Sequence, residues 1–202
     1  MNQIALPLDW PENERDDEFI LSAANAAVAR HLEHWALWPV PATILTGPRK
    51  SGRSLIGRLF AAKTGGRLFD EAWAADEEAL FHAWNAAMAT RRPLLIVADA
   101  EPPAWPIALP DLASRLTATP RVAILPPDDD LLRALLERGL TRRGLLVPPP
   151  LVAWLSARIE RSYVAIVTAI DALDRASLSR HHRLTIPLAR TTLIEAGVID
   201  DS

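Results

Sequence analysis

The stretch Gly47-Pro48-Arg49-Lys50-Ser51-Gly52-Arg53-Ser54 follows the pattern G-x-x-x-x-G-K-[ST] of phosphate-binding loops, with Arg53 in place of the lysine. Upstream, residues 42–46 have the composition of a short buried strand, and downstream residues 55–62 are typical of a helix start. This order matters because the amides of such a loop and the N-terminus of the helix must converge on one anion. The sequence therefore predicts a strand, a phosphate-binding loop and a helix that ends near Lys63.

The eight residues of the loop are candidate contacts for the phosphate groups of a nucleotide, and the hydroxyl of Ser54 is a candidate ligand for its magnesium ion. Arg53 keeps the positive charge of the usual lysine. Its guanidinium is a planar fork rather than a compact ammonium, so the geometry toward the β- and γ-phosphates must change. The alternative is a loop that keeps the fold but holds only sulfate, or nothing.

Composition indicates an ordinary globular chain. Its 202 residues suit one α/β domain and a small accessory domain, and 23% of them are charged. There is no cysteine, no apolar run long enough for a membrane span and no secretory signal, so we expect the cytoplasm, without a membrane partner. The net charge of −3 argues against non-specific nucleic-acid binding.

Two domains are expected after a polar leader. The leader covers residues 1–18, an α/β core covers residues 19–127, and an all-helical segment covers residues 128–202, where strand patterns are absent. Further strands are expected at 67–69, 93–98 and 121–125, with helices at 19–38, 76–90 and 109–116. In the C-terminal segment, helices are expected near 128–138, 148–158, 160–180 and 186–196.

Several stretches together resemble the AAA+ module of the bacterial replication initiator DnaA, and more closely the shorter DnaA-related regulators of the Hda type. The strongest is residues 105–116, which read WPIALPDLASRL. Residues 126–129 (PPDD), 158–162 (RIERS), 173–177 (LDRAS) and 184–188 (LTIPL) follow in the family's order. The resemblance implies a P-loop AAA+ fold, which is a parallel sheet with helices on both faces followed by a small helical lid. It also implies ADP or ATP with magnesium as ligand.

Two acidic positions compete for the magnesium-binding role. The resemblance places Asp99 at the sensor-1 turn, so Asp70 and Glu71 fall at a degenerate Walker-B position, with Asp70 as a second magnesium ligand. Only 15 residues separate Ser54 from Asp70, which leaves room for one helix and one strand. We therefore expect one strand fewer than in the usual module. The alternative for Asp70 and Glu71 is that they only cap a helix.

Arg115 takes the position of the family's arginine finger, which reaches in trans to a nucleotide held by another molecule. The alternative is a salt bridge within the domain to Asp111, four residues earlier. The resemblance also places Val164 where the sensor-2 arginine normally stands, and Arg161 and Arg158 lie about one and two turns earlier. This change, together with Arg53, argues against efficient ATP hydrolysis by the chain alone.

The segment Gln3-Ile4-Ala5-Leu6-Pro7-Leu8 resembles the sliding-clamp-binding peptide of Hda-type proteins. A glutamine amide suits a polar pocket, the leucines suit an apolar cleft, and Pro7 limits the unbound conformations. The alternative is a tail that packs on its own domain.

These expectations predict a regulator of replication initiation that binds the sliding clamp and promotes hydrolysis of ATP bound to DnaA. No DNA-binding helix-turn-helix follows the lid in this sequence, so we expect no direct sequence-specific DNA binding. A stand-alone ATPase or phosphoryl-transfer enzyme and a nucleotide-free DnaA-binding adaptor are the alternative functions. A homo-oligomer formed through the finger face is also left open.

Overall fold

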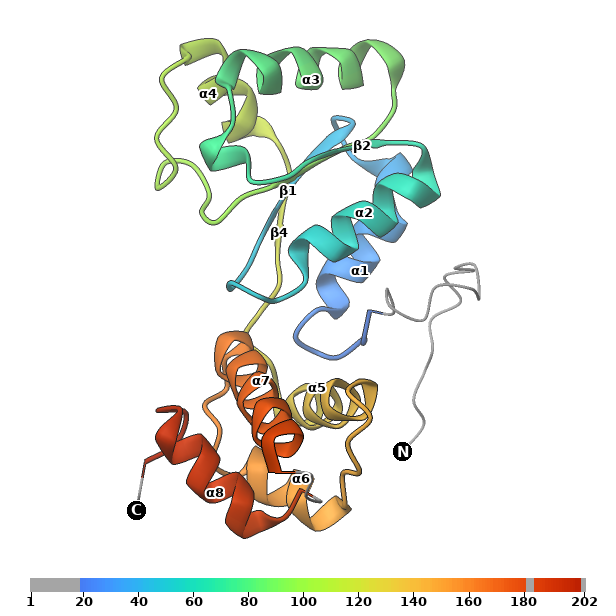
Figure 1. Ribbon diagram of the computed structural model, residues 1–202. Helices are drawn as coiled ribbons and strands as arrows, with labels where there is room; N and C mark the ends of the chain where they lie inside the picture. Colours follow the sequence, from blue (N-terminus) through green and yellow to red (C-terminus); the bar gives the residue numbers. More distant parts are fainter. Residues whose placement is uncertain (1–18, 181–183, 201–202) are drawn as a thin grey trace. The chain divides into compact units, whose positions relative to one another are not determined.

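The computed structural model describes residues 19–180 and 184–200 of the chain. They divide into two compact units, which separate between Leu125 and Pro126. The first unit is an α/β layer structure and the second is a small helical bundle (Figure 1). None of the helices in these described ranges combines the length and apolarity needed to span a membrane.

The first unit is built on a four-stranded parallel sheet with the strand order β2-β3-β1-β4. Its strands are β1 (Ala42–Thr46), β2 (Arg67–Phe69), β3 (Leu94–Val97) and β4 (Arg121–Ala123). The two central strands, β1 and β3, are buried along their whole length, as expected for a parallel sheet covered on both faces. The expected α/β fold class, with one strand fewer than the usual module, is thus confirmed.

Helices cover both faces of this sheet. They are α1 (Ala26–Glu33), α2 (Arg53–Thr64), α3 (Glu77–Thr90) and α4 (Pro110–Ala118), with short 3-10 helices η1 (Trp35–Leu37) and η2 (Ala72–Ala74). Figure 1 shows α1 and α2 on one face and α3 and α4 on the other. Alternate residues such as Ile44 and Ile96 point into the core shared with α3 and α4, where they meet Leu80, Leu112 and Leu116.

The first helix is shorter than the sequence indicates. We expected a helix over residues 19–38, but α1 begins at Ala26 and ends at Glu33. Asn25 explains the late start, because its side-chain oxygen accepts from the amide of Ser22 and its amide donates to the carbonyl of Ile20. These local bonds close a turn before the helix and compete with helical hydrogen bonding. Helix α3 begins where the sequence indicates, because the side chain of Asp76 accepts a hydrogen bond from the amide of Glu78 and caps the helix.

The second unit holds four helices among its described residues: α5 (Asp129–Arg142), α6 (Pro149–Ser156), α7 (Tyr163–Arg180) and α8 (Ile186–Glu195). Leucines at helical spacing on α5, namely Leu132, Leu136 and Leu140, pack with Leu155 and Leu173 in one core. Helices α5 and α7 approach closely at Gly139, where an added Cβ would lie 2.4 Å from the Cδ1 atom of Ile170. The all-helical character expected after residue 128 is confirmed.

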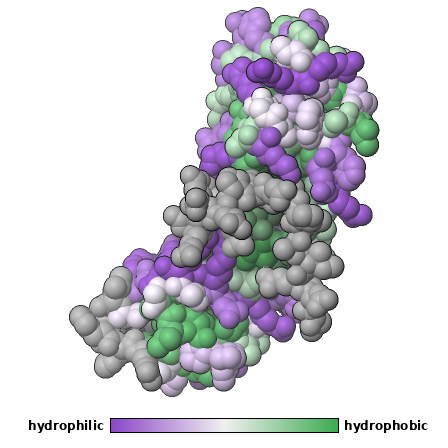
Figure 2. All heavy atoms as spheres, turned by 90° about the vertical axis from the view of Figure 1, so that its right-hand side faces the viewer, coloured by the Kyte–Doolittle hydropathy of each residue, from purple (hydrophilic) through white to green (hydrophobic). Residues whose placement is uncertain are grey.

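Exposed large apolar side chains do not gather on one element. Those in the described residues are Leu37, Trp73, Met88, Leu125, Leu146, Val164 and Ile186. The face shown in Figure 2 likewise mixes hydrophilic residues with smaller apolar areas.

Candidate functional site

The loop between β1 and α2 has the backbone geometry that an anion cradle needs. Lys50 and Gly52 have positive φ angles of 64° and 88°, and the amide of Ser51 donates to the carbonyl of Pro48. Gly52 is the N-cap residue of α2 and no side chain caps this helix, so no side-chain acceptor occupies its first amides. Gly47 and Pro48 are half-buried, whereas Arg49 and Lys50 are exposed.

Ser51 lies in the same loop and is 6% exposed, and its hydroxyl has no hydrogen-bond partner among the described residues. A buried hydroxyl is normally satisfied, because leaving it unpaired costs free energy. Together with the amides of the loop, this orphaned group fits a phosphate ligand. The donor set at residues 47–54 is therefore compatible with the nucleotide that the sequence predicts.

Ser54 and Asp70 are brought together by the fold. β2 ends at Phe69, and the Asp70 Oδ1 atom accepts from the hydroxyl of Ser54 at 3.1 Å and from the amide of Glu71 at 3.0 Å. A hydroxyl beside a carboxylate is the oxygen pair that magnesium takes in nucleotide sites. Glu71 is exposed, with a φ of 50°, and precedes η2 without capping it through its side chain. The described residues contain no group of three or more acidic, histidine or cysteine side chains that would hold a metal by themselves.

Arg53 and Asp99 form an ion pair at the same edge of the sheet. Because β1 and β3 are parallel neighbours, the loop after β1 and the turn after β3 lie side by side. The Nη2 atom of Arg53 lies 2.5 Å from the Oδ1 atom of Asp99, and Nη1 donates to the carbonyl of Ala98 at 2.6 Å. The Trp73 ring lies 5.8 Å from the guanidinium carbon. The guanidinium of Arg53 is thus already engaged within the domain, whereas Arg49 and Lys50 of the same loop are exposed.

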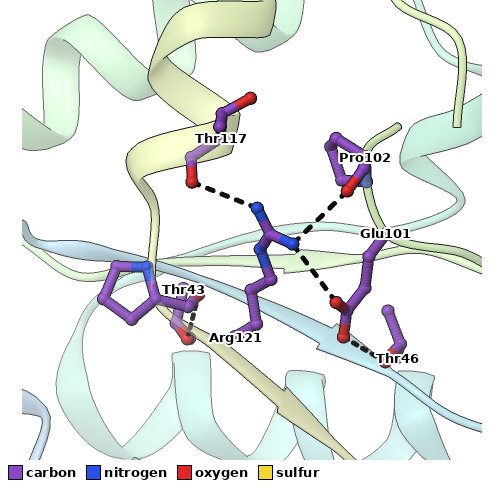
Figure 3. A network of polar contacts seen from close by, with 7 residues as sticks. Thr43, Thr46, Glu101, Pro102, Thr117 and Arg121 are labelled. Atoms are coloured by element: carbon purple, nitrogen blue, oxygen red, sulfur yellow. Dashed lines mark hydrogen bonds and ion pairs between the residues drawn. The ribbon is translucent and has the colours of Figure 1, made fainter. Parts of the chain in front are cut away.

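A polar network joins the end of β1, the turn after β3 and the end of α4 (Figure 3). Arg121, the first residue of β4, donates to the carbonyls of Thr117 and Pro102 and to the carboxylate of Glu101. The other carboxylate oxygen of Glu101 accepts from the hydroxyl of Thr46, the residue before Gly47. The network therefore connects the start of the phosphate loop to the helix that carries Arg115.

Arg115 lies in the last turn of α4 and is half-buried against α3. Its guanidinium carbon is 4.5 Å from the ring centre of Phe81 and 4.8 Å from that of Trp84, and its Nη1 atom donates to Asn85. The side chain thus contacts α3 rather than Asp111, the alternative partner weighed from the sequence. Thr119 strengthens the contact between the helices, because its hydroxyl accepts from the Trp84 indole and donates to the Arg115 carbonyl.

In the helical unit, Val164 lies in the first turn of α7 and is 47% exposed. The two nearby arginines have partners of their own. Arg158 stacks on Trp154 with 4.6 Å between the guanidinium carbon and the ring centre, and the Arg161 Nε atom lies 2.7 Å from the Asp129 Oδ1 atom. The bond from Arg161 holds the pKa of Asp129 below its usual value.

Outside this ion pair, two groups of the described residues have a displaced pKa. Burial, assisted by the charge of Asp128, raises the pKa of Tyr163 to about 12. Burial lowers the pKa of His31, whose Nε2 atom lies 2.7 Å from the Thr43 hydroxyl oxygen. Neither group lies in the phosphate loop, so these pKa shifts reflect packing in the two units.

The candidate clamp-binding residues Gln3, Ile4, Ala5, Leu6, Pro7 and Leu8 lie outside the described residues. Sequence reasoning missed Phe81, Asn85, Glu101 and Arg121. A signal existed for Phe81, since it lies three residues before Trp84 and shares the helix face that the pattern assigned as apolar. No local pattern pointed to the partnership of Glu101 and Arg121.

Comparison with known proteins identifies the helical unit and the fold. Residues 128–193 match the family model of the Hda lid domain. Domain III of the replication initiation protein DnaA from Thermotoga maritima is similar in structure, with a TM-score of 0.72 at 13% identity, over 93% of this chain and 98% of that one.

Two other solved structures share the fold. AMPPCP-bound DnaA from Aquifex aeolicus gives a TM-score of 0.58 at 14% identity over 79% of this chain, which spans 63% of that DnaA chain. The Holliday junction branch migration motor RuvB from Thermotoga maritima gives a TM-score of 0.58 at 11% identity, over 88% of this chain and 70% of that one. At such low identities these structures show that the fold is shared, and the lid-domain match adds a sequence relationship over residues 128–193.

Proposed function

We infer that this chain, an Hda-type member of the DnaA-related AAA+ proteins, regulates chromosomal replication initiation by promoting hydrolysis of the ATP bound to DnaA in the cytoplasm. The observation that carries this proposal is the Hda lid at residues 128–193 joined to a core with the fold of DnaA domain III. The sliding clamp is the second proposed partner, through residues 3–8.

Arg115 is the proposed arginine finger. A finger stabilises the negative charge that develops on a transferring γ-phosphate, and it must be held in place before the partner arrives. The rings of Phe81 and Trp84 and the oxygen of Asn85 restrict the guanidinium here while leaving it partly exposed. This geometry supports a preorganised cation at the surface of α4.

The chain's own loop is the proposed site for ADP or ATP. Backbone amides within residues 49–54 and the Ser51 hydroxyl would hold the phosphates, and Ser54 with Asp70 would hold magnesium. A bound nucleotide would supply negative charge that the loop and Arg53 neutralise. Efficient hydrolysis by the chain alone is not proposed, because Val164 brings no cation and Arg158 and Arg161 contact Trp154 and Asp129.

The finger is tested by DnaA ATP turnover with sliding clamp on DNA. Arg115→Lys keeps the charge and the aliphatic stem but loses the planar fork. Arg115→Ala removes the charge, the stem and the fork. We expect both variants to lower the stimulated turnover by at least about tenfold, because an arginine finger is worth about 10³–10⁵-fold in kcat. Arg92→Ala is the matched control, because Arg92 is an exposed arginine of the same unit. Unchanged turnover with folded Arg115 variants would reject the role.

Clamp binding has a separate test. A chain that lacks residues 1–8 should lose retention by immobilised clamp, and so should Gln3→Ala with Leu6→Ala in the full chain. Substitution of Asn2, outside the resembling segment, is the control. Retention of the truncated chain would refute the assignment of the peptide.

One observation favours a second candidate, a nucleotide-free adaptor that binds DnaA. The loop cation Arg53 is held by Asp99 and by the Ala98 carbonyl, so a phosphate must compete with these partners. Calorimetric titration of the full chain with ADP and ATP separates the two candidates, since the adaptor predicts no heat of binding. Turnover of ATP by the chain alone would instead favour a stand-alone ATPase.

A further inference from the structure

The ion pair with Asp99 engages Arg53, the residue that stands where phosphate-binding loops usually have their lysine. Arg53 is the first residue of α2 and its side chain is 10% exposed, whereas the side chain of Asp99 is 44% exposed. Both terminal nitrogens of the guanidinium have partners, at 2.5 Å on Asp99 and at 2.6 Å on the Ala98 carbonyl. The fork is therefore oriented toward the end of β3.

A phosphate bound to the loop amides would share this guanidinium with a carboxylate. Two anions that contact one cation repel each other, and this edge of the sheet already carries Asp70 and Glu71. Asp70 has other partners, the Ser54 hydroxyl and the Glu71 amide, so Asp99 is the carboxylate that contacts Arg53. Glu101, two residues later, is paired with Arg121.

We propose that Asp99 sets the affinity of the loop for phosphate-bearing ligands by holding Arg53 in this internal ion pair. Asp99 is then a positioning residue that weakens phosphate binding through Arg53, rather than a sensor of a bound phosphate. The inference rests on the proposed phosphate-binding role of residues 47–54, and it is independent of the proposed action of Arg115 on DnaA.

Asp99→Asn isolates the charge, because asparagine keeps an acceptor oxygen and nearly the same shape while losing the negative charge. We expect the full-length variant to bind ADP with magnesium about tenfold more tightly than the natural chain, since hydrogen bonds that involve charged groups are about twice as strong as neutral ones. Isothermal titration calorimetry measures the dissociation constant directly. Asp111→Asn is the matched control, because it removes the same charge from an exposed residue of α4.

A second variant links the gain to Arg53. In the background of Arg53→Ala, the Asp99→Asn change should leave ADP affinity unchanged, because no guanidinium remains to be released. Circular dichroism melting confirms that each variant is folded. The proposal is overturned if Asp99→Asn changes the affinity by less than about threefold, or if neither protein binds ADP. The proposal is also overturned if Asp111→Asn raises the ADP affinity equally, or if Asp99→Asn still raises it in the Arg53→Ala background. The DnaA turnover assay on Arg115 succeeds or fails separately.

Discussion

Replacement of Gly47 by alanine tests whether the phosphate loop is held against β4. Gly47 has a φ of 151°, and an added Cβ would lie 2.9 Å from the Ile124 Cβ and 3.0 Å from the Ile124 carbonyl oxygen. Ile124 is 2% exposed, and its amide donates to the Thr46 carbonyl next to the loop. The clash therefore involves backbone atoms and a buried side chain, which have little freedom to move.

The destabilisation expected from Gly47→Ala has two parts, backbone strain and overpacking. The same substitution at a second glycine measures the strain alone. Gly65, at the C-terminus of α2, has a φ of 65° but has no atom within 4 Å of an added Cβ. Gly65→Ala should therefore cost only the backbone strain, about 1–2 kcal/mol. Gly47→Ala adds overpacking of about 1–3 kcal/mol to a similar strain, for a total of about 2–5 kcal/mol.

Urea unfolding followed by tryptophan fluorescence measures this difference, because five of the six tryptophans in the described residues precede residue 126 and report on the first unit. The free energies of unfolding are comparable when the two variants keep the same m-value. If Gly47→Ala destabilises the protein no more than Gly65→Ala does, contact with Ile124 does not constrain the loop, and our account of its geometry fails.

Three further predictions concern other parts of the molecule. The chain has one tyrosine, so ultraviolet absorbance of tyrosinate reports Tyr163 directly; its midpoint should lie near pH 12 in the folded protein. Because the pKa of Tyr163 is raised in the folded protein, the neutral phenol contributes its full stability below pH 10. That contribution, about 2–3 kcal/mol, is lost as the pH rises toward 12. The variant Tyr163→Phe should not show this loss of stability. Arg121→Ala should lower the free energy of unfolding by about 1–2 kcal/mol, because the carbonyl of Thr117 and the carboxylate of Glu101 lose a donor; unaltered urea unfolding would contradict this. Leu136→Ala should cost about 2–5 kcal/mol in a thermal or urea melt, since this leucine is fully buried in the core of the helical unit, and a cost below about 1 kcal/mol would show that the site collapses freely.

Local signals were sufficient for the main elements. The apolar runs at residues 42–46 and 94–97 predict buried strands, and the glycines and the helix start after them predict the loop, because these features depend on neighbouring residues. The helical unit was predictable for the same reason, since leucines at helical spacing on α5 need only a partner surface to bury. The sequence did not show that Asp70 and Asp99 follow neighbouring strands, which the pairing of β2 with β3 brings about.

The partners of the charged side chains depended on the tertiary structure. Arg53 and Asp99 are 46 residues apart, and they meet because parallel strands bring their carboxyl ends to one edge of the sheet. Arg115 contacts Phe81 and Trp84 because α3 and α4 pack on the same face. No pattern in the chain encodes such pairs, since a hydrogen bond between distant residues is decided by the position of the backbone rather than by local preference. The sequence by itself determined the main strands and helices and the loop at residues 47–54. The tertiary structure decided which group contacts each arginine.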